Sequence, residues 1–200
     1  MKSLSAMPLE NIERVKALLF DLDGTFVSRN IIESKAYRYL TQLHDSGIKT
    51  IAVTGRPAGW CDLMARWWPI NAVVGENGAF FYSKISGKVV RQTFHAMDLL
   101  PDYQKKLQSL FEKLLEKYPY LKLASDQSFR HWDIAVDIAE KVNVSREVAV
   151  DIVRICEAEG AKAAISNILV NIWCGEYTKE NMSINVLKSY GLTEKDGVYI

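Results

Sequence analysis

The stretch VKALLFDLDGT, residues 15–25, decides how the rest of the sequence is interpreted. It begins with a short and mostly apolar run, residues 15–20, that ends at an acidic loop. Such a run is typical of a parallel β-strand covered on both faces, although a short buried helix would look similar. Two more apolar runs end as abruptly: residues 48–53 stop at Thr-Gly-Arg-Pro, and residues 72–74 stop at Gly-Glu-Asn-Gly.

Helical patterns lie between these three runs. Apolar residues recur at helical spacing over 33–44, and a second helix is predicted over 60–68, where Pro69 closes it. The alternation of strand and helix predicts βαβ units in an open parallel sheet, hence an α/β, Rossmann-like core. Because ligands bind at the carboxyl ends of the strands in such sheets, we expect the three polar loops to meet at one crevice.

The pattern changes after residue 79. Predicted strands and two amphipathic helices alternate there, at 80–83 with 88–94, 102–118, 121–124 with 134–138, 145–159, and 161–166 with 168–174. The α/β pattern then resumes with a helix over 179–190 and an apolar strand that begins at Val198. We therefore expect an inserted α+β unit over 81–176 and a discontinuous core formed by 1–80 and 177–200.

Composition excludes several functional classes. Hydrophobic residues make up 48% and charged residues 24%, as in globular proteins, and a net charge of +1 argues against a nucleic-acid partner. No apolar run approaches the length of a membrane helix, and the first residues form no signal peptide. Three distant cysteines fit neither a disulfide framework nor a zinc site. We expect a soluble, cytoplasmic protein and leave the oligomeric state open.

The loop Asp-Leu-Asp-Gly-Thr at 21–25 places two carboxylates close together, an arrangement that suits Mg²⁺. A calcium-binding EF-hand loop would need Gly at its sixth position and Glu at its twelfth, where this chain has Phe26 and Ile32. The Gly-Lys-Ser/Thr ending of a P-loop is absent as well. A solvated acidic turn remains the simplest alternative, and the position directly after a buried strand argues against it.

The motifs together resemble those of the haloacid dehalogenase-like (HAD) phosphatase superfamily. DLDGT resembles the first motif, VTGR at 53–56 the second, and Lys179 the third. GENGA at 75–79 is similar to the loop of a branch that includes Cof-type sugar phosphatases, sucrose-phosphate and trehalose-phosphate phosphatases and phosphomannomutase. In that branch a cap domain is inserted between the second and third motifs, where this chain has its α+β insertion.

The resemblance implies a role for each matching residue. Asp21 would be the nucleophile that forms an aspartyl-phosphate, and Asp23 the general acid and base. Thr54 and the amide of Gly55 would hold phosphate oxygens, and Lys179 would offset negative charge. Mg²⁺ would bind Asp21 and the backbone carbonyl of Asp23. The implied function is Mg²⁺-dependent hydrolysis of a small phosphomonoester, such as a sugar phosphate.

The resemblance ends at the fourth motif. In the family an acidic Gly-Asp-x-x-x-Asp loop follows the strand that begins here at Val198 and supplies further carboxylate ligands, whereas this sequence ends at Ile200. The expectation is a core sheet that lacks its C-terminal part, an incomplete metal site and weak or absent activity. Two alternatives stay open: a phosphomutase of the phosphomannomutase type, and a non-catalytic fragment that acts as a binding module.

Substrate contacts are predicted less directly. Arg56 and Asn77 lie in the second-motif and GENGA loops and are assigned to substrate binding. Arg130 could clamp a second anionic group of the substrate, or it could form a local ion pair with Asp133. Trp60 is the tryptophan expected at the mouth of the site, whereas Trp67 or Trp68 would pack the helix on the sheet. Sugar contacts by two cap asparagines compete with turn and edge roles; these are Asn167 and Asn171. No histidine cluster with metal-ligand spacing is found.

Overall fold

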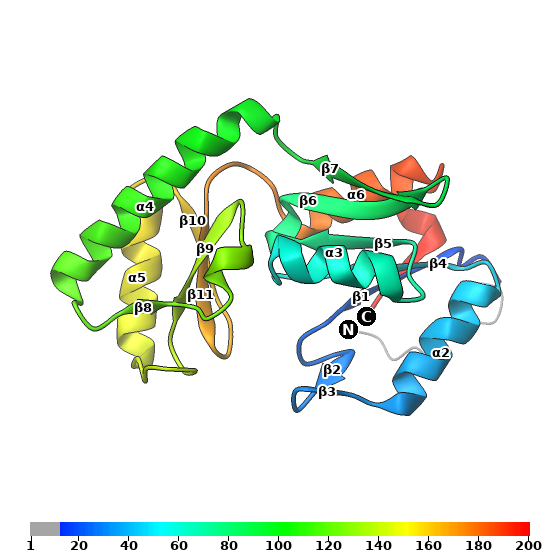
Figure 1. Ribbon diagram of the computed structural model, residues 1–200, viewed down its shortest axis with the longest axis horizontal. Coiled ribbons are helices and arrows are strands. Elements are labelled where there is room, and N and C mark those ends of the chain that lie inside the picture. Colours follow the sequence, from blue (N-terminus) through cyan, green and yellow to red (C-terminus); the bar gives the residue numbers. More distant parts are fainter. Residues whose placement is uncertain (1–12) are drawn as a thin grey trace.

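The computed structural model describes residues 13–200 and contains two main sheets (Figure 1). The larger one has six strands in the order β12-β1-β4-β5-β6-β7. Its parallel part consists of β12 (Gly197–Tyr199), β1 (Ala17–Asp21), β4 (Lys49–Val53) and β5 (Ala72–Gly75). The predicted parallel sheet is therefore confirmed, and the ends of β1, β4 and β5 lie side by side.

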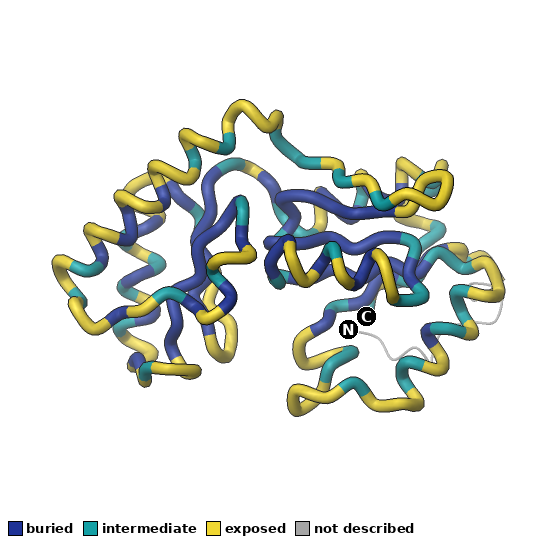
Figure 2. The backbone as a smooth tube through the Cα atoms, in the orientation of Figure 1, coloured by how far each residue is buried: buried dark blue, intermediate teal, exposed yellow. Residues whose placement is uncertain are grey.

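Helices cover both faces of this sheet because successive side chains along each strand point to opposite sides. On β1, Phe20 packs in the cluster that also contains Met64 of α3 (Ala58–Trp67) and Leu40 of α2 (Ser34–Asp45). Leu19, its neighbour, packs in the cluster of Val186 from α6 (Lys179–Ser189). The strands β1, β4 and β5 are accordingly buried along most of their length (Figure 2).

The second sheet is antiparallel, in the order β10-β11-β9-β8. It consists of β8 (Lys122–Leu123), β9 (Asp133–Asp137), β10 (Lys162–Ile165) and β11 (Leu169–Trp173). Two helices, α4 (Leu100–Lys117) and α5 (Arg146–Ala158), share its hydrophobic cluster, and Ser145 caps α5 as predicted. The inserted α+β unit is thus one helical layer packed on one sheet (Figure 1).

One prediction about this unit is wrong. The hairpin of β6 (Phe80–Ile85) and β7 (Lys88–Thr93) was expected in the insertion, but β6 pairs antiparallel with β5 and extends the core sheet. The reason is the turn η2 (Glu76–Gly78), which reverses the chain directly after β5. The first four residues of β6, 80–83, are then buried in the core. We propose that the inserted unit, called the cap below, begins after β7.

Shorter elements complete the described part of the chain. A hairpin of β2 (Val27–Ser28) and β3 (Ile31–Ile32) follows the DLDGT loop, and short 3₁₀ turns occupy η3 (Met97–Leu99), η4 (Gln127–Phe129) and η5 (Glu194–Asp196). The three cysteines are buried and unpaired. Within residues 13–200, no helix combines the length and apolar character needed to cross a membrane.

Candidate active site

A cavity of about 720 Å³ opens between the ends of the core strands and the cap. The core contributes the DLDGT loop and the loop after β4, and the cap contributes the β10–β11 hairpin. Most of the predicted site residues line it: Asp21, Asp23, Gly55, Arg56, Asn77, Arg130, Asn167, Asn171 and Lys179. The expected meeting of loops at one crevice is thus found in the structure.

Asp21 and Lys179 are in direct contact. Asp21 is the last residue of β1, and Lys179 is the first residue of α6, whose N-cap is Thr178. The Lys179 Nζ atom lies 2.7 Å from Asp21 Oδ1, and the side chains are 36% and 26% exposed. The pair therefore joins residues 158 positions apart and stays accessible from the cavity.

Asp23 forms a second ion pair with Arg56. The guanidinium binds in a fork geometry, with Nη2 2.6 Å from Oδ1 and Nε 3.1 Å from Oδ2. It also lies over the ring of Trp60, 4.7 Å from the centroid. Arg56, predicted to bind substrate, is in this structure the partner of Asp23. Trp60 is half-exposed beside it but does not line this cavity; it lines a second pocket that shares Asp23 and Arg56 with the first.

The two tryptophans at the end of α3, Trp67 and Trp68, differ in burial. Trp67 is 77% exposed, so it does not pack the helix on the sheet. Trp68 does pack, with its ring 5.8 Å from that of Phe26 and 6.1 Å from that of Tyr37.

The loop 54–56 contains one backbone N–H group without a hydrogen-bond acceptor among residues 13–200, that of Gly55. Thr54 is buried, and its hydroxyl accepts a hydrogen bond from the amide of Arg56 at 3.0 Å. Gly55 lines the cavity. A Cβ added at Gly55 would lie 2.9 Å from Asn77 Oδ1, so a larger residue here would displace the Asn77 side chain. A free N–H at this position can bind an anion.

Arg130 is not free to hold a ligand, and the local ion-pair alternative is confirmed. Its side chain is 1% exposed, with Nε 3.0 Å from Asp126 Oδ1 and Nη1 2.9 Å from Asp133 Oδ1. The same Nη1 donates to the carbonyl of Gly55 at 3.1 Å, a contact between cap and core that the sequence did not predict. Asn77 and Asn171, also predicted ligands, both donate to Asp133 Oδ2 at 3.4 Å.

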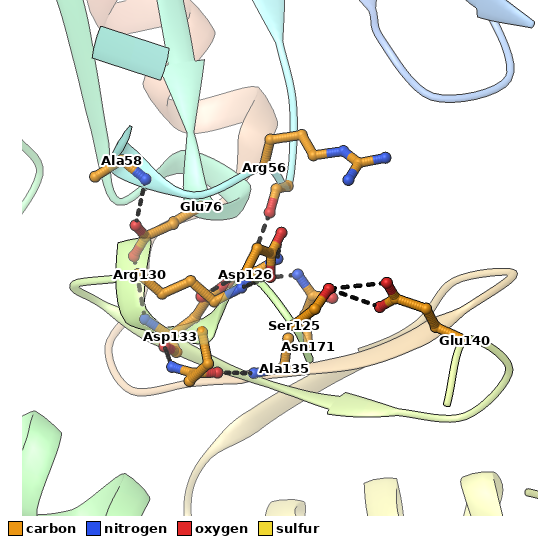
Figure 3. Close-up of polar contacts among 12 residues, drawn as sticks. Arg56, Ala58, Glu76, Ser125, Asp126, Arg130, Asp133, Ala135, Glu140 and Asn171 are labelled. Carbon is orange, nitrogen blue, oxygen red and sulfur yellow. Dashed lines mark hydrogen bonds and ion pairs between the residues drawn. The ribbon is translucent and has the colours of Figure 1, made fainter. Parts of the chain in front are cut away.

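Glu76 is the residue that sequence reasoning missed. It is fully buried, and its carboxylate accepts hydrogen bonds from the amides of Ala58, His131, Trp132 and Asp133 (Figure 3). Burial raises its pKa to about 8 and the Asp133 carboxylate adds to the rise, whereas the amide donors lower the pKa. The available signal was a lone charged residue directly after the apolar run 72–74.

No metal ligand set is complete among the described residues, 13–200: they contain no group of three or more His, Cys, Asp or Glu side chains that could hold a metal ion. The three histidines lie apart, as predicted. His44 is near Thr50, His95 accepts from the amide of Glu176, and His131 contacts Arg91.

The comparisons with known proteins agree with this geometry. A family model described as haloacid dehalogenase-like hydrolase matches residues 18–128, more than half of the chain. The chain belongs to this family. No match was found among the curated proteins.

Several solved structures share the fold at low identity. Thermoplasma acidophilum 0175 matches with a TM-score of 0.74 and 15% identity, covering 92% of this chain and 76% of its own. The HAD subclass IIB sugar phosphatase BT4131 has a TM-score of 0.64 and 15% identity, covering 92% and 80%. The sucrose-phosphatase of Synechocystis sp. PCC6803, solved with sucrose and phosphate, has a TM-score of 0.64 and 13% identity, covering 92% and 73%. At these identities the likeness establishes the fold only.

Proposed function

We propose that this HAD hydrolase is a Mg²⁺-dependent phosphatase that acts on a small phosphomonoester through an aspartyl-phosphate. The observation that carries the proposal is the contact of Lys179 with Asp21 at a cavity that Gly55, whose amide has no acceptor among residues 13–200, also lines. A carboxylate nucleophile, a cation beside it and an anion-binding N–H are the parts that phosphoryl transfer needs.

The first step uses Asp21 and Asp23. A carboxylate oxygen of Asp21 attacks phosphorus, the bond from phosphorus to the ester oxygen breaks, and Asp23 gives its proton to that oxygen, which leaves as an alcohol. Water then attacks the aspartyl-phosphate, Asp23 takes its proton, and phosphate leaves with the Asp21 carboxylate restored. Lys179 offsets charge on Asp21 and on the transferring group throughout.

Asp23 is to donate a proton in the first step, yet in this structure its carboxyl group is paired with the Arg56 guanidinium. The substrate phosphate is a second anion at the same cavity, which Arg56 also lines. We infer that the bound phosphate draws the guanidinium away from Asp23 and so leaves the Asp23 carboxyl group free to reach the ester oxygen.

The residues at the cavity fit Mg²⁺. This ion prefers oxygen donors and keeps water and phosphate in its remaining positions. Asp21 offers a part-exposed carboxylate, and the carbonyl of Asp23 accepts no hydrogen bond from the described residues. When bound, Mg²⁺ neutralises phosphate charge and stabilises the transition state.

A sugar phosphate is the substrate class we propose. The cap hairpin places the exposed amide side chain of Asn167 at the cavity, and this group can bond hydroxyl groups. The structurally similar BT4131 is a sugar phosphatase, and the Synechocystis protein binds sucrose and phosphate.

The test is phosphate release from p-nitrophenyl phosphate and a panel of sugar phosphates, with Mg²⁺ and with a chelator. Asp21→Asn should lower kcat at least about a thousandfold, because the nucleophile is removed. Asp62→Asn, which removes an exposed carboxylate of α3, is the matched control and should retain full activity. Activity that survives Asp21→Asn would refute the mechanism, and activity that survives the chelator would refute the metal requirement.

A further inference from the structure

The turn at 76–78 touches three parts of the molecule. Its residues Glu76, Asn77 and Gly78 have φ values of +43°, +58° and +110°, and two consecutive non-glycine residues in the left-handed region indicate a turn held by its surroundings. At Gly78 an added Cβ would lie 2.2 Å from the carbonyl oxygen of Thr178, the N-cap of the helix that begins with Lys179. The turn is therefore packed directly against the start of α6.

The same turn fixes the loop 54–56. The amide of Glu76 donates to the carbonyl of Arg56 at 3.1 Å, and the amide of Asn77 donates to that of Thr54 at 3.2 Å. The Glu76 carboxylate also accepts from the amide of Ala58 at 2.9 Å, at the start of α3. Because the carbonyl and amide of one peptide point in opposite directions, the bond to the Thr54 carbonyl aims the Gly55 N–H away from the turn.

The cap supplies the remaining contacts. Three consecutive cap amides donate to the Glu76 carboxylate, those of His131 at 3.0 Å, Trp132, and Asp133 at 3.2 Å. Arg130, the residue before them, donates to the Gly55 carbonyl, so each of the three carbonyls of 54–56 has a donor. Figure 3 shows Glu76 and Arg130 reaching across the gap between cap and core from opposite sides.

Apolar packing accompanies these hydrogen bonds. A Cβ added to Gly59 of α3 would lie 3.1 Å from the side chain of Phe129 in the cap. The segment 126–133 is thus seated on the start of α3 and on the loop before it. If the cap segment moved away, the cap amides and the Glu76 carboxylate would lose their hydrogen-bond partners. Water can replace these partners only once the segment has opened, so undocking costs free energy.

We propose that Glu76 and Arg130 are positioning residues that clasp cap segment 126–133 onto loop 54–56, so that anion binding at Gly55 depends on the docked cap. The proposal rests on the proposed function of 54–56 as the phosphate-binding loop. Since coupling between two sites is reciprocal, phosphate bound at the loop must in turn stabilise the docked segment. The cap is then part of the phosphate site as well as a cover over it.

Two substitutions weaken the clasp and leave Asp21, Asp23 and Lys179 in place. Glu76→Gln puts an NH₂ group among N–H donors, and Arg130→Lys keeps the charge but cannot reach Asp126, Asp133 and the Gly55 carbonyl together. Each variant should raise the inhibition constant for inorganic phosphate about tenfold or more. Its kcat/KM should also fall, by more than any loss of folded protein indicated by the melting temperature accounts for. Glu140→Gln is the control, because Glu140 is an exposed cap residue whose carboxylate has Ser125 as its one hydrogen-bond partner within residues 13–200.

Hydrogen exchange of the full chain, with and without inorganic phosphate and Mg²⁺, tests the coupling without relying on turnover. In the unsubstituted protein and in Glu140→Gln, phosphate should slow exchange of the amides of 131–133 about tenfold, although no phosphate touches them. In Arg130→Lys this slowing should be lost. Slowing at 54–58 but not at 131–133, or full phosphate affinity in a folded Arg130→Lys variant, would overturn the clasp. No slowing at either segment would overturn the proposed function, and the clasp with it.

Discussion

Two clusters of charged side chains lie on either side of loop 54–56, and they differ in what water can reach. In the open cluster, Asp21 with Lys179 and Asp23 with Arg56, side-chain exposure ranges from 21% to 48%. In the clasp, the side chains of Arg130 and Asp133 are 1% and 0% exposed.

The difference assigns the two clusters different work. Charges in the open cluster keep lone pairs and N–H groups that a ligand can use, and they remain hydrated in its absence. In the clasp every charged group is occupied by a protein partner, because a buried charge without one is too costly to keep. Arg130 shows this most clearly, since burial works against its charged form and yet Asp133 and Asp126 raise its pKa. The accessible ion pairs of the open cluster suit a role in catalysis, and the buried ion pairs of the clasp suit a role in positioning.

Breaking the clasp should have the largest effect on stability. Arg130→Met leaves the carboxylates of Asp126 and Asp133 buried without a counter-charge, so the free energy of unfolding should fall by about 3–5 kcal/mol. Urea denaturation measures the loss. Arg66→Met is a matched control, because Arg66 and Asp62 have the same i, i+4 spacing on an exposed face of α3, and its stability should change little. Equal losses for the two variants would contradict the distinction between clusters.

Breaking the open cluster should affect activity instead. Lys179→Met removes the cation beside Asp21, and kcat should fall about 100-fold because charge on the transferring group is no longer offset. The melting temperature should change little, since the pair is part-exposed. Lys188→Met, an exposed change in the last turn of the same helix, should leave kcat unchanged. A Lys179 variant that loses stability while keeping its kcat would reverse the assignment.

The smallest expected effect concerns pH at the edge of the clasp. Burial, and to a lesser degree the charge of Arg91, lowers the pKa of His131, whose Nδ1 lies 2.8 Å from Arg91 Nη1. Below the ordinary value of about 6.5 the unfolded chain therefore binds more protons here than the folded one, and stability is lost as the pH falls. Glu76 acts with the opposite sign between 4.5 and about 8, where its raised pKa lets the folded state bind more protons.

His131→Gln isolates the contribution of His131 to the pH dependence of stability, because Glu76 is present in both proteins and its contribution cancels. Urea denaturation at about pH 7.5 and 5.5 should show a larger loss of stability on acidification in the unsubstituted protein than in the variant. Identical losses would mean that His131 keeps its ordinary titration in the folded state.

Local sequence pattern predicted the elements that bring the open cluster together. Strands at 17–21, 49–53 and 72–75 follow from short apolar runs, and parallel order places their ends at one edge. The sequence pattern could not tell which sheet the hairpin after residue 79 would join, because the residue pattern of a strand does not identify the strand with which it pairs. It also could not choose between ligand and ion pair for Arg130, because the choice depends on a carbonyl 75 residues away.

The sequence by itself determined the kind of chemistry, because an acidic loop after a buried strand, a Thr-Gly loop and a helix that begins with lysine each have a local signature. Only the tertiary structure decided which charges remain accessible: Glu76, as acidic as Asp21 in the sequence, is closed in by amides of the cap. Burial is a property of what packs around a residue, and the segments that pack around Glu76 come from three separate parts of the chain.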